Sequence, residues 1–259
     1  MIQARTATLK WIVYYGDKLK IDDVRDVDWA IVDQDIDPKS LKNGRTKFIA
    51  YVSVGEAEDY RDYWAKVAGS RMLVEKNANW KGAHLVDIRS QEWRNILIGH
   101  TLKKVVDKGF DGVFLDTIDT AIYLEDKDVK TFAGSKKTLV ELVKLIRQRY
   151  PDLMIIPNNG LEILNEYAGD VDAVLVEDLY THYDFEKKLS IQTQNDIMAK
   201  KEKLLDEFSL HHKKPILNLL YEDSSQSKLA RFAIERSRQK GYQWYLTTVD
   251  LMKIGMVNP

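Results

Sequence analysis

Eight short apolar segments that alternate with stretches of helical periodicity predict an α/β fold, a (β/α)8 TIM barrel with an insertion between its third and fourth strands. Strands that alternate with helices pair in parallel through right-handed crossovers. Eight such units close a barrel, whereas an open doubly wound sheet has about five to seven strands and is the structural alternative. The length of 259 residues is ordinary for one barrel, although it could also hold two smaller domains. We expect a single barrel domain over residues 1–259.

The expected strands are runs of aliphatic, β-branched and aromatic residues bounded by Gly, Asp, Asn or Pro. A further apolar run, His84–Ile88, lies in the long connection from Gly55 to Asp111, and we interpret it as a short ninth strand in an insertion over the barrel mouth. The eight barrel strands, in chain order, are Trp11–Tyr15, Ala30–Asp33, Phe48–Ser53, Gly112–Asp116, Leu153–Pro157, Ala173–Glu177, Pro215–Leu220 and Gln243–Thr247.

The segments between these strands place apolar residues at three- and four-residue steps, the pattern of amphipathic helices. One such helix is predicted to begin at Ser135, which we interpret as its N-cap. The first two crossovers are too short for more than a turn or two of helix. The predicted helices are Gln91–Lys108, Ser135–Tyr150, Gln194–His211 and Ser224–Lys240, and the short crossovers are Ile21–Val27 and Pro38–Gly44.

Composition excludes several classes of function. The 39 basic and 40 acidic residues nearly balance, so we expect no nucleic-acid partner, which would require a basic excess. The absence of cysteine excludes disulfides, thiolate metal sites and cysteine nucleophiles. No apolar run reaches transmembrane length, and Met1 to Lys10 lack the apolar core of a signal peptide. We therefore expect either a cytoplasmic protein or a chain from which the leader is absent.

Polar side chains gather where the predicted strands end. In a barrel these ends share one rim, at which the active site is built. Asp, Asn and Gly after a strand are often only turn formers and helix caps, and this interpretation suits Asp178, Glu222 and Asp223. Asp116 and Glu177 differ, because each continues an apolar strand without a break. A carboxylate there is costly to desolvate unless the site uses or pairs it.

Asp116 and Glu177 are therefore the predicted catalytic residues. Two carboxylates that face one cavity are the minimum apparatus for glycosidic cleavage, and the ends of the fourth and sixth strands lie near each other in a barrel. We expect the protein to be a monomer. Other polar or aromatic residues near the rim are predicted to bind substrate. These residues are Tyr14, Asp33, Asp35, Tyr51, Ser53, Glu56, Asp119, Asn158, Asn159, Tyr180 and Tyr221.

Other chemistries lack their sequence signals. The five histidines show no HxH or HExxH spacing, and the chain has no Gly-rich phosphate loop and no GxSxG elbow. None of the predicted strands ends in the lysine that a Schiff-base mechanism requires. We expect no metal and no cofactor, with a divalent cation on Asp33, Asp35 or Asp119 as the alternative.

Two segments carry a family resemblance: Tyr51-Val-Ser-Val-Gly-Glu-Ala-Glu-Asp-Tyr-Arg61 and Gly109-Phe-Asp-Gly-Val-Phe-Leu-Asp116. With them the sequence resembles glycoside hydrolase family 114, the endo-α-1,4-polygalactosaminidase-like TIM barrels, formerly labelled cysteinyl-tRNA synthetase-related. The resemblance continues at Trp80, Val86-Asp-Ile-Arg89, Pro157-Asn-Asn-Gly160 and Val176-Glu-Asp178, and so spans most of the chain.

The resemblance implies an endo-acting hydrolase of a galactosamine-containing polysaccharide, secreted or held in the cell envelope. The family's strand-four Asp and strand-six Glu correspond to Asp116 and Glu177, and by analogy Asp116 is the nucleophile and Glu177 the acid/base of a retaining mechanism. Asp33, Asp35, Glu56 and Asp119 would then face ammonium groups. The alternatives are a polysaccharide-binding barrel without turnover, a metal-dependent deacetylase, and a tRNA-synthetase-related protein, although HIGH-like and KMSKS-like segments are absent.

Overall fold

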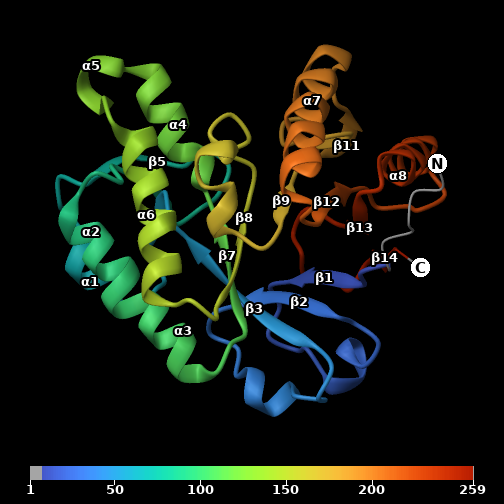
Figure 1. Ribbon diagram of the computed structural model, residues 1–259, viewed down its shortest axis with the longest axis horizontal. Coiled ribbons are helices and arrows are strands. Elements are labelled where there is room, and N and C mark those ends of the chain that lie inside the picture. Colours follow the sequence, from blue (N-terminus) through green and yellow to red (C-terminus); the bar gives the residue numbers. More distant parts are fainter. Residues whose placement is uncertain (1–7, 259) are drawn as a thin grey trace.

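The computed structural model describes residues 8–258, and its centre is a set of parallel strands (Figure 1). Five of them pair in the order β1-β2-β3-β7-β8, and β9, β12 and β13 pair in a second group. A parallel bridge between Asn158 and Leu175 joins the two groups. The bounds are β1 Trp11–Tyr14, β2 Trp29–Asp33, β3 Lys47–Ser53, β7 Gly112–Asp116, β8 Met154–Pro157, β9 Val174–Val176, β12 Ile216–Tyr221 and β13 Gln243–Thr247.

All eight predicted barrel strands are therefore present, each within two residues of its expected limits, and the α/β fold class is confirmed. Between the last strand and the first, the described residues form no backbone ladder, because the short antiparallel strand β14 (Met256–Val257) occupies that edge of β13. Side chains make the connection instead. The Trp11 indole N–H donates to the Gln243 carbonyl at 3.0 Å, and the Trp11 and Tyr245 rings pack 5.5 Å apart.

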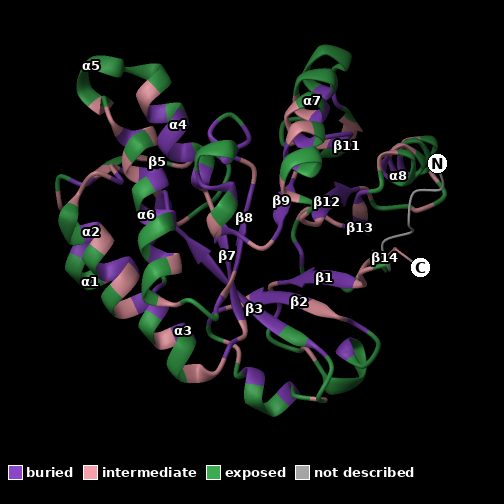
Figure 2. Cartoon of the chain, in the orientation of Figure 1, coloured by how far each residue is buried: buried purple, intermediate pink, exposed green. Residues whose placement is uncertain are grey.

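The strands form the core because their side chains are buried on both faces. Every residue of β1 and β12 is buried, and so are all but the first residue of β3 and all but the last of β7. Such continuous burial is typical of parallel sheets covered by helices. Figure 2 shows the buried strands inside and the exposed faces of α6, α7 and α8 outside. These buried strands therefore position the side chains at their C-terminal ends.

The helices surround this core. The predicted helix 91–108 is continuous but has a π-helical turn in its middle, and the two short crossovers hold single 3-10 turns. Ser135 is not an N-cap, because Gly134 caps α6 with φ 89° and Ser135 starts the helix. The helices are η1 Ile21–Val24, η2 Pro38–Leu41, α1 Trp64–Val67, α2 Gln91–Ile96, η3 Leu97–Leu102, α3 Lys103–Lys108, α4 Ile118–Lys127, α5 Val129–Phe132, α6 Ser135–Arg149, η4 Leu164–Glu166, η5 Ala168–Asp170, α7 Asn195–His212 and α8 Lys228–Lys240.

Two excursions stand at the C-terminal ends of the strands. The insertion after β3 is a three-stranded antiparallel sheet of order β4-β6-β5, with β4 at Glu56–Glu58, β5 at Leu73–Lys76 and β6 at Ala83–Val86. The predicted ninth strand is β6, displaced by one to two residues. After β9 follows a hairpin of β10 (Thr181–Asp184) and β11 (Leu189–Gln192), which the sequence patterns did not predict. Among residues 8–258, no helix combines the length and apolar character needed to cross a bilayer.

Candidate active site

Asp116 and Glu177 meet at one side chain, Asn158. The Asn158 Nδ2 atom donates to Asp116 Oδ1 at 2.7 Å and to Glu177 Oε1 at 3.0 Å. The three residues stand at the ends of the neighbouring strands β7, β8 and β9. Because both oxygens bond to the same nitrogen, they are at most about 5.7 Å apart, the sum of the two distances. The two carboxyl groups thus face one small space.

The backbone turns sharply directly after each of these three residues. Thr117, Asn159 and Asp178 all have positive φ, at 58°, 55° and 54°. Left-handed backbone is tolerated by Asn and Asp but is strained for the β-branched Thr117. Such strain persists only where the surroundings hold it, and it concentrates at functional sites. The turns end the strands at once, so that the carboxylates project from the strand ends.

The Ser-Val-Gly-Glu segment holds the strained Thr117 turn in place. The Gly55 N–H donates to Thr117 Oγ1 at 2.8 Å, and the Ser53 hydroxyl lies 2.9 Å from the same atom. A Cβ on Gly55 would stand 2.2 Å from the Thr117 carbonyl oxygen, so only glycine permits this approach. Ser53, predicted to bind substrate, is buried and also donates to the Glu56 carbonyl. Its recorded contacts position the residue that follows Asp116.

The environment raises the pKa of each of the two carboxyl groups. Burial raises the pKa of Asp116 to about 6, although the hydrogen bond from Asn158 opposes the rise. Burial, and then the negative charge of Asp116, raise the pKa of Glu177 well above its ordinary value. A pair with unequal pKa values can carry one proton between them near neutral pH. The larger opposition to ionisation at Glu177 comes from its burial and from the negative charge of Asp116.

Three tyrosines surround the pair. Burial, and then the charge of Asp116, raise the pKa of Tyr15 and of Tyr51, and burial followed by the charge of Glu177 raises that of Tyr221. The Tyr15 and Tyr51 rings meet edge to face at 4.9 Å. Sequence reasoning selected Tyr14 rather than Tyr15. The Tyr14 ring covers Gly16, and alternation along β1 is the signal that would have distinguished the neighbours.

Glu56, predicted to bind substrate, is a third buried carboxyl beside the pair. It accepts hydrogen bonds from Asn77 Nδ2 at 3.0 and 3.2 Å and a longer one from Thr120 at 3.4 Å. Burial, reinforced by the charge of Asp116, raises its pKa to about 7. Asp119 lies on the first turn of α4, and its charge raises the pKa of Asp116. The site is therefore strongly acidic.

Asp33 and Asp35, which were predicted to bind substrate, are paired with Arg61. Its guanidinium binds both oxygens of Asp33, at 2.9 and 2.7 Å, and also Asp35 at 2.9 Å and Glu58 at 2.8 Å. The Arg61 and Glu58 side chains are 4% and 6% exposed, so this ion pair is buried, whereas Asp35 at 55% lies at the surface. Glu58 further accepts from the hydroxyl of Tyr51 at 3.0 Å. Sequence reasoning named neither Glu58 nor Arg61 as a site residue, although both stand in the segment that carries the family resemblance.

The remaining predicted residues divide between two places. Asn159 Oδ1 accepts the Glu177 N–H at 3.2 Å and so supports the pair. Tyr180 turns away and donates to Glu202 Oε1 on α7 at 2.9 Å. Lys201, which the sequence did not single out, donates to the carbonyls of Glu177 and Asp178 at 2.8 and 3.3 Å. Burial lowers the pKa of Lys201, and the nearby charges of Asp178 and Glu177 oppose that change.

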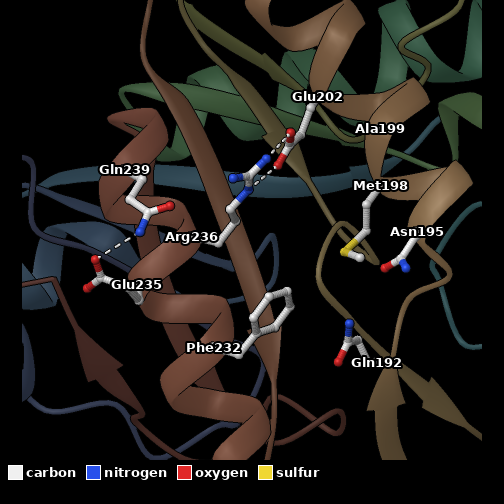
Figure 3. A pocket seen from close by; sticks show the side chains of 9 residues that line it. All are labelled: Gln192, Asn195, Met198, Ala199, Glu202, Phe232, Glu235, Arg236 and Gln239. Carbon is white, nitrogen blue, oxygen red and sulfur yellow. Dashed lines mark hydrogen bonds and ion pairs between the residues drawn. The ribbon is translucent and has the colours of Figure 1, made fainter.

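A separate hollow of about 430 Å³ opens between α7 and α8 (Figure 3). The Arg236 guanidinium crosses it to Glu202 with two contacts of 2.8 Å, and the Phe232 ring stands at one side. None of the residues that surround the carboxyl pair lines this hollow. The hollow is therefore lined by residues other than those around the carboxyl pair.

Comparisons with known proteins show the family of the chain. The model of glycoside-hydrolase family GH114 matches residues 3–258. A protein of Thermotoga maritima is 34% identical over 51% of this chain and 44% of its own length, and one of Deinococcus radiodurans is 29% identical over 82% of this chain and 67% of its own. The chain thus spans less than half the length of the first of these relatives.

Solved structures share the fold. The glycoside hydrolase domain of PelA from Pseudomonas aeruginosa superposes with a TM-score of 0.84 at 22% identity, over 97% of this chain and 99% of that one. Aspergillus fumigatus Ega3, solved in complex with galactosamine, gives 0.76 at 17% identity, over 100% and 98%. With the family match over nearly the whole length, the chain belongs to glycoside-hydrolase family GH114.

Proposed function

We propose that the protein is an endo-acting, retaining glycosidase that cleaves a galactosamine-containing polysaccharide such as α-1,4-polygalactosamine. The observation that carries the proposal is the single Asn158 nitrogen bonded to both Asp116 and Glu177. Retaining glycosidases hold their carboxyl groups about 5–5.5 Å apart, whereas inverting ones leave about 6.5–9.5 Å for a water molecule. An upper limit of about 5.7 Å between the bonded oxygens favours the retaining mechanism.

The pKa order assigns the roles. Asp116, with a pKa of about 6, is ionised at neutral pH and attacks the anomeric carbon. Glu177, whose pKa is raised further by burial and by Asp116, keeps its proton and donates it to the leaving glycosidic oxygen. The glycosyl–Asp116 ester is then hydrolysed by a water molecule that gives a proton to the Glu177 carboxylate. That step breaks the ester and restores both groups.

The acidity of the site supports an aminosugar polymer as substrate. Glu56 and Asp119 stand beside the pair and would attract the ammonium of galactosamine, which Ega3 binds in its solved structure. Asp33 and Asp35 are already paired with Arg61, and we assign them the role of fixing the insertion rather than of binding the sugar. Tyr15, Tyr51 and Tyr221 are proposed to surround the sugar ring at the cleavage point.

Product analysis tests the proposal. Wild type, Asp116→Asn and Glu177→Gln would be incubated with polygalactosamine and with partially de-N-acetylated α-1,4-galactosaminogalactan. We expect oligosaccharides from wild type only, and NMR should show that the first product keeps the anomeric configuration of the substrate. Glu222→Gln is the matched control, because Glu222 also follows a barrel strand but its side chain accepts only from the adjacent Asp223 N–H among the bonds recorded.

Activity retained in both carboxyl variants would remove the assignment, and inversion at the anomeric carbon would refute the retaining mechanism. Binding of the polymer without cleavage by wild type would favour the polysaccharide-binding alternative. We further propose that the protein is monomeric and that it is secreted or held in the cell envelope, where a polysaccharide substrate is found. Light scattering after size-exclusion chromatography, and fractionation of cells, test these two points.

A further inference from the structure

Three aromatic side chains from two separate excursions meet at the rim. Trp80 belongs to the insertion after β3, and Tyr183 and Phe185 belong to the hairpin after β9. The Trp80 and Phe185 rings meet edge to face at 5.6 Å, and the Tyr183 and Phe185 rings at 5.2 Å. Trp80 is nevertheless 49% exposed and Phe185 37%. We call these three residues the rim aromatic cluster.

Short chains of contacts tie the rim aromatic cluster to the carboxyl pair. The backbone N–H of Trp80 donates to Asn77 Oδ1 at 3.1 Å, and the same Asn77 donates through Nδ2 to Glu56. Glu56 in turn lies close enough to Asp116 that the charge of Asp116 raises the pKa of Glu56. On the other side, β10 begins four residues after Glu177. The cluster therefore stands on the rim that carries the candidate chemistry.

Both loops that carry the cluster are held in place by side chains. Asp184 Oδ1 accepts the backbone N–H groups of Glu186 and Lys187 at 3.1 and 2.9 Å, which fixes the turn that presents Phe185. Asn77 does the same for the turn that presents Trp80, because its Oδ1 also accepts the Asn79 N–H at 2.9 Å. Large apolar rings that are exposed on rigid supports are typical of binding surfaces, since little entropy is lost when a ligand docks.

Building on the proposed function, we propose that the rim aromatic cluster is a substrate subsite that holds an aminosugar ring at the rim of the active site. The C–H face of a pyranose ring is apolar and can cover an exposed aromatic face. The ammonium group of a de-N-acetylated residue adds a cation–π attraction, which is strongest for Trp. Acetylation removes that charge, so the subsite selects for free amines.

Kinetics with Trp80→Ala and Phe185→Ala test the subsite. The matched control is Phe232→Ala, which removes the same side chain at the same 37% exposure from α8, beside the separate hollow. For polygalactosamine we expect KM to rise about tenfold in each rim variant with kcat within about twofold of wild type, as loss of a cation–π and stacking contact implies. For a fully N-acetylated polymer the rise for Trp80→Ala should be clearly smaller. Phe232→Ala should match wild type.

Calorimetric binding of a galactosamine oligosaccharide to Glu177→Gln, alone and combined with Trp80→Ala or with Phe185→Ala, gives a second readout that needs no turnover. Cleavage by wild type with unchanged KM and binding in both rim variants would overturn the subsite and leave the proposed function standing. An equal loss in Phe232→Ala would also overturn it, because the effect would then not be specific to the cluster. If wild type neither cleaves nor binds aminosugar polymers, the proposed function and the subsite fail together.

Discussion

Asn158→Ala should move the whole pH–activity profile to higher pH. The Asn158 amide donates to both carboxyl groups and opposes the rise of both pKa values. A hydrogen bond to a charged group contributes about 1.5–3 kcal/mol, and one pKa unit corresponds to about 1.4 kcal/mol. The pKa of Asp116, about 6 in the native site, should therefore rise by roughly one to two units in the variant.

The sign follows from the roles of the two groups. Activity requires ionised Asp116, so the acid limb of kcat/KM, set by the pKa near 6, should move to about 7–8. Protonated Glu177 sets the alkaline limb, which should move upward as well, because that residue loses the same donor. The assay is kcat/KM on polygalactosamine from pH 4 to 10, and carboxyl NMR titration measures the two groups directly.

The control for this experiment is Asn195→Ala, which removes an exposed amide at the start of α7. Its profile should coincide with that of wild type. An acid limb that stays near pH 6 in Asn158→Ala would refute the reasoning, because the amide would then not stabilise the Asp116 carboxylate. A uniform loss of activity without any shift would indicate that Asn158 affects only the geometry of the pair.

Three further predictions concern stability and positioning. Asp116→Asn should raise the free energy of unfolding at pH 7 by about 2–3 kcal/mol and leave it unchanged at pH 3. Folding raises the pKa of the Asp116 carboxyl from 3.8 to about 6, so wild type loses stability as pH increases through that range and the variant does not. Urea unfolding at both pH values measures the difference. Gly55→Ala should lower kcat about 100-fold, since its Cβ would displace the Thr117 carbonyl and with it the strand end, and the crystal structure of the variant would show whether that carbonyl moves. Arg61→Met should destabilise the fold by about 3–5 kcal/mol, because Glu58 loses its buried counter-charge; a change in Tm of less than a few degrees would contradict this.

Local patterns were enough to locate the strands and the carboxyl pair. Buried parallel strands read as short continuous apolar runs, so each of the eight was found within two residues. Asp116 and Glu177 were identified because an acidic residue at the end of an apolar run has few inexpensive structural roles. Both features depend on neighbours in the sequence, and that is why the sequence alone could predict them.

What only the tertiary structure decided depends on contacts between distant segments. The bond from Asn158 to both carboxyl groups joins the ends of three strands, and Arg61 takes Asp33 from 28 residues away. The meeting of Trp80 with Phe185 likewise requires the direction of each side chain in space. A sequence pattern records which residues are polar or aromatic, but the closure of the fold determines which of them already have partners and which still face the site.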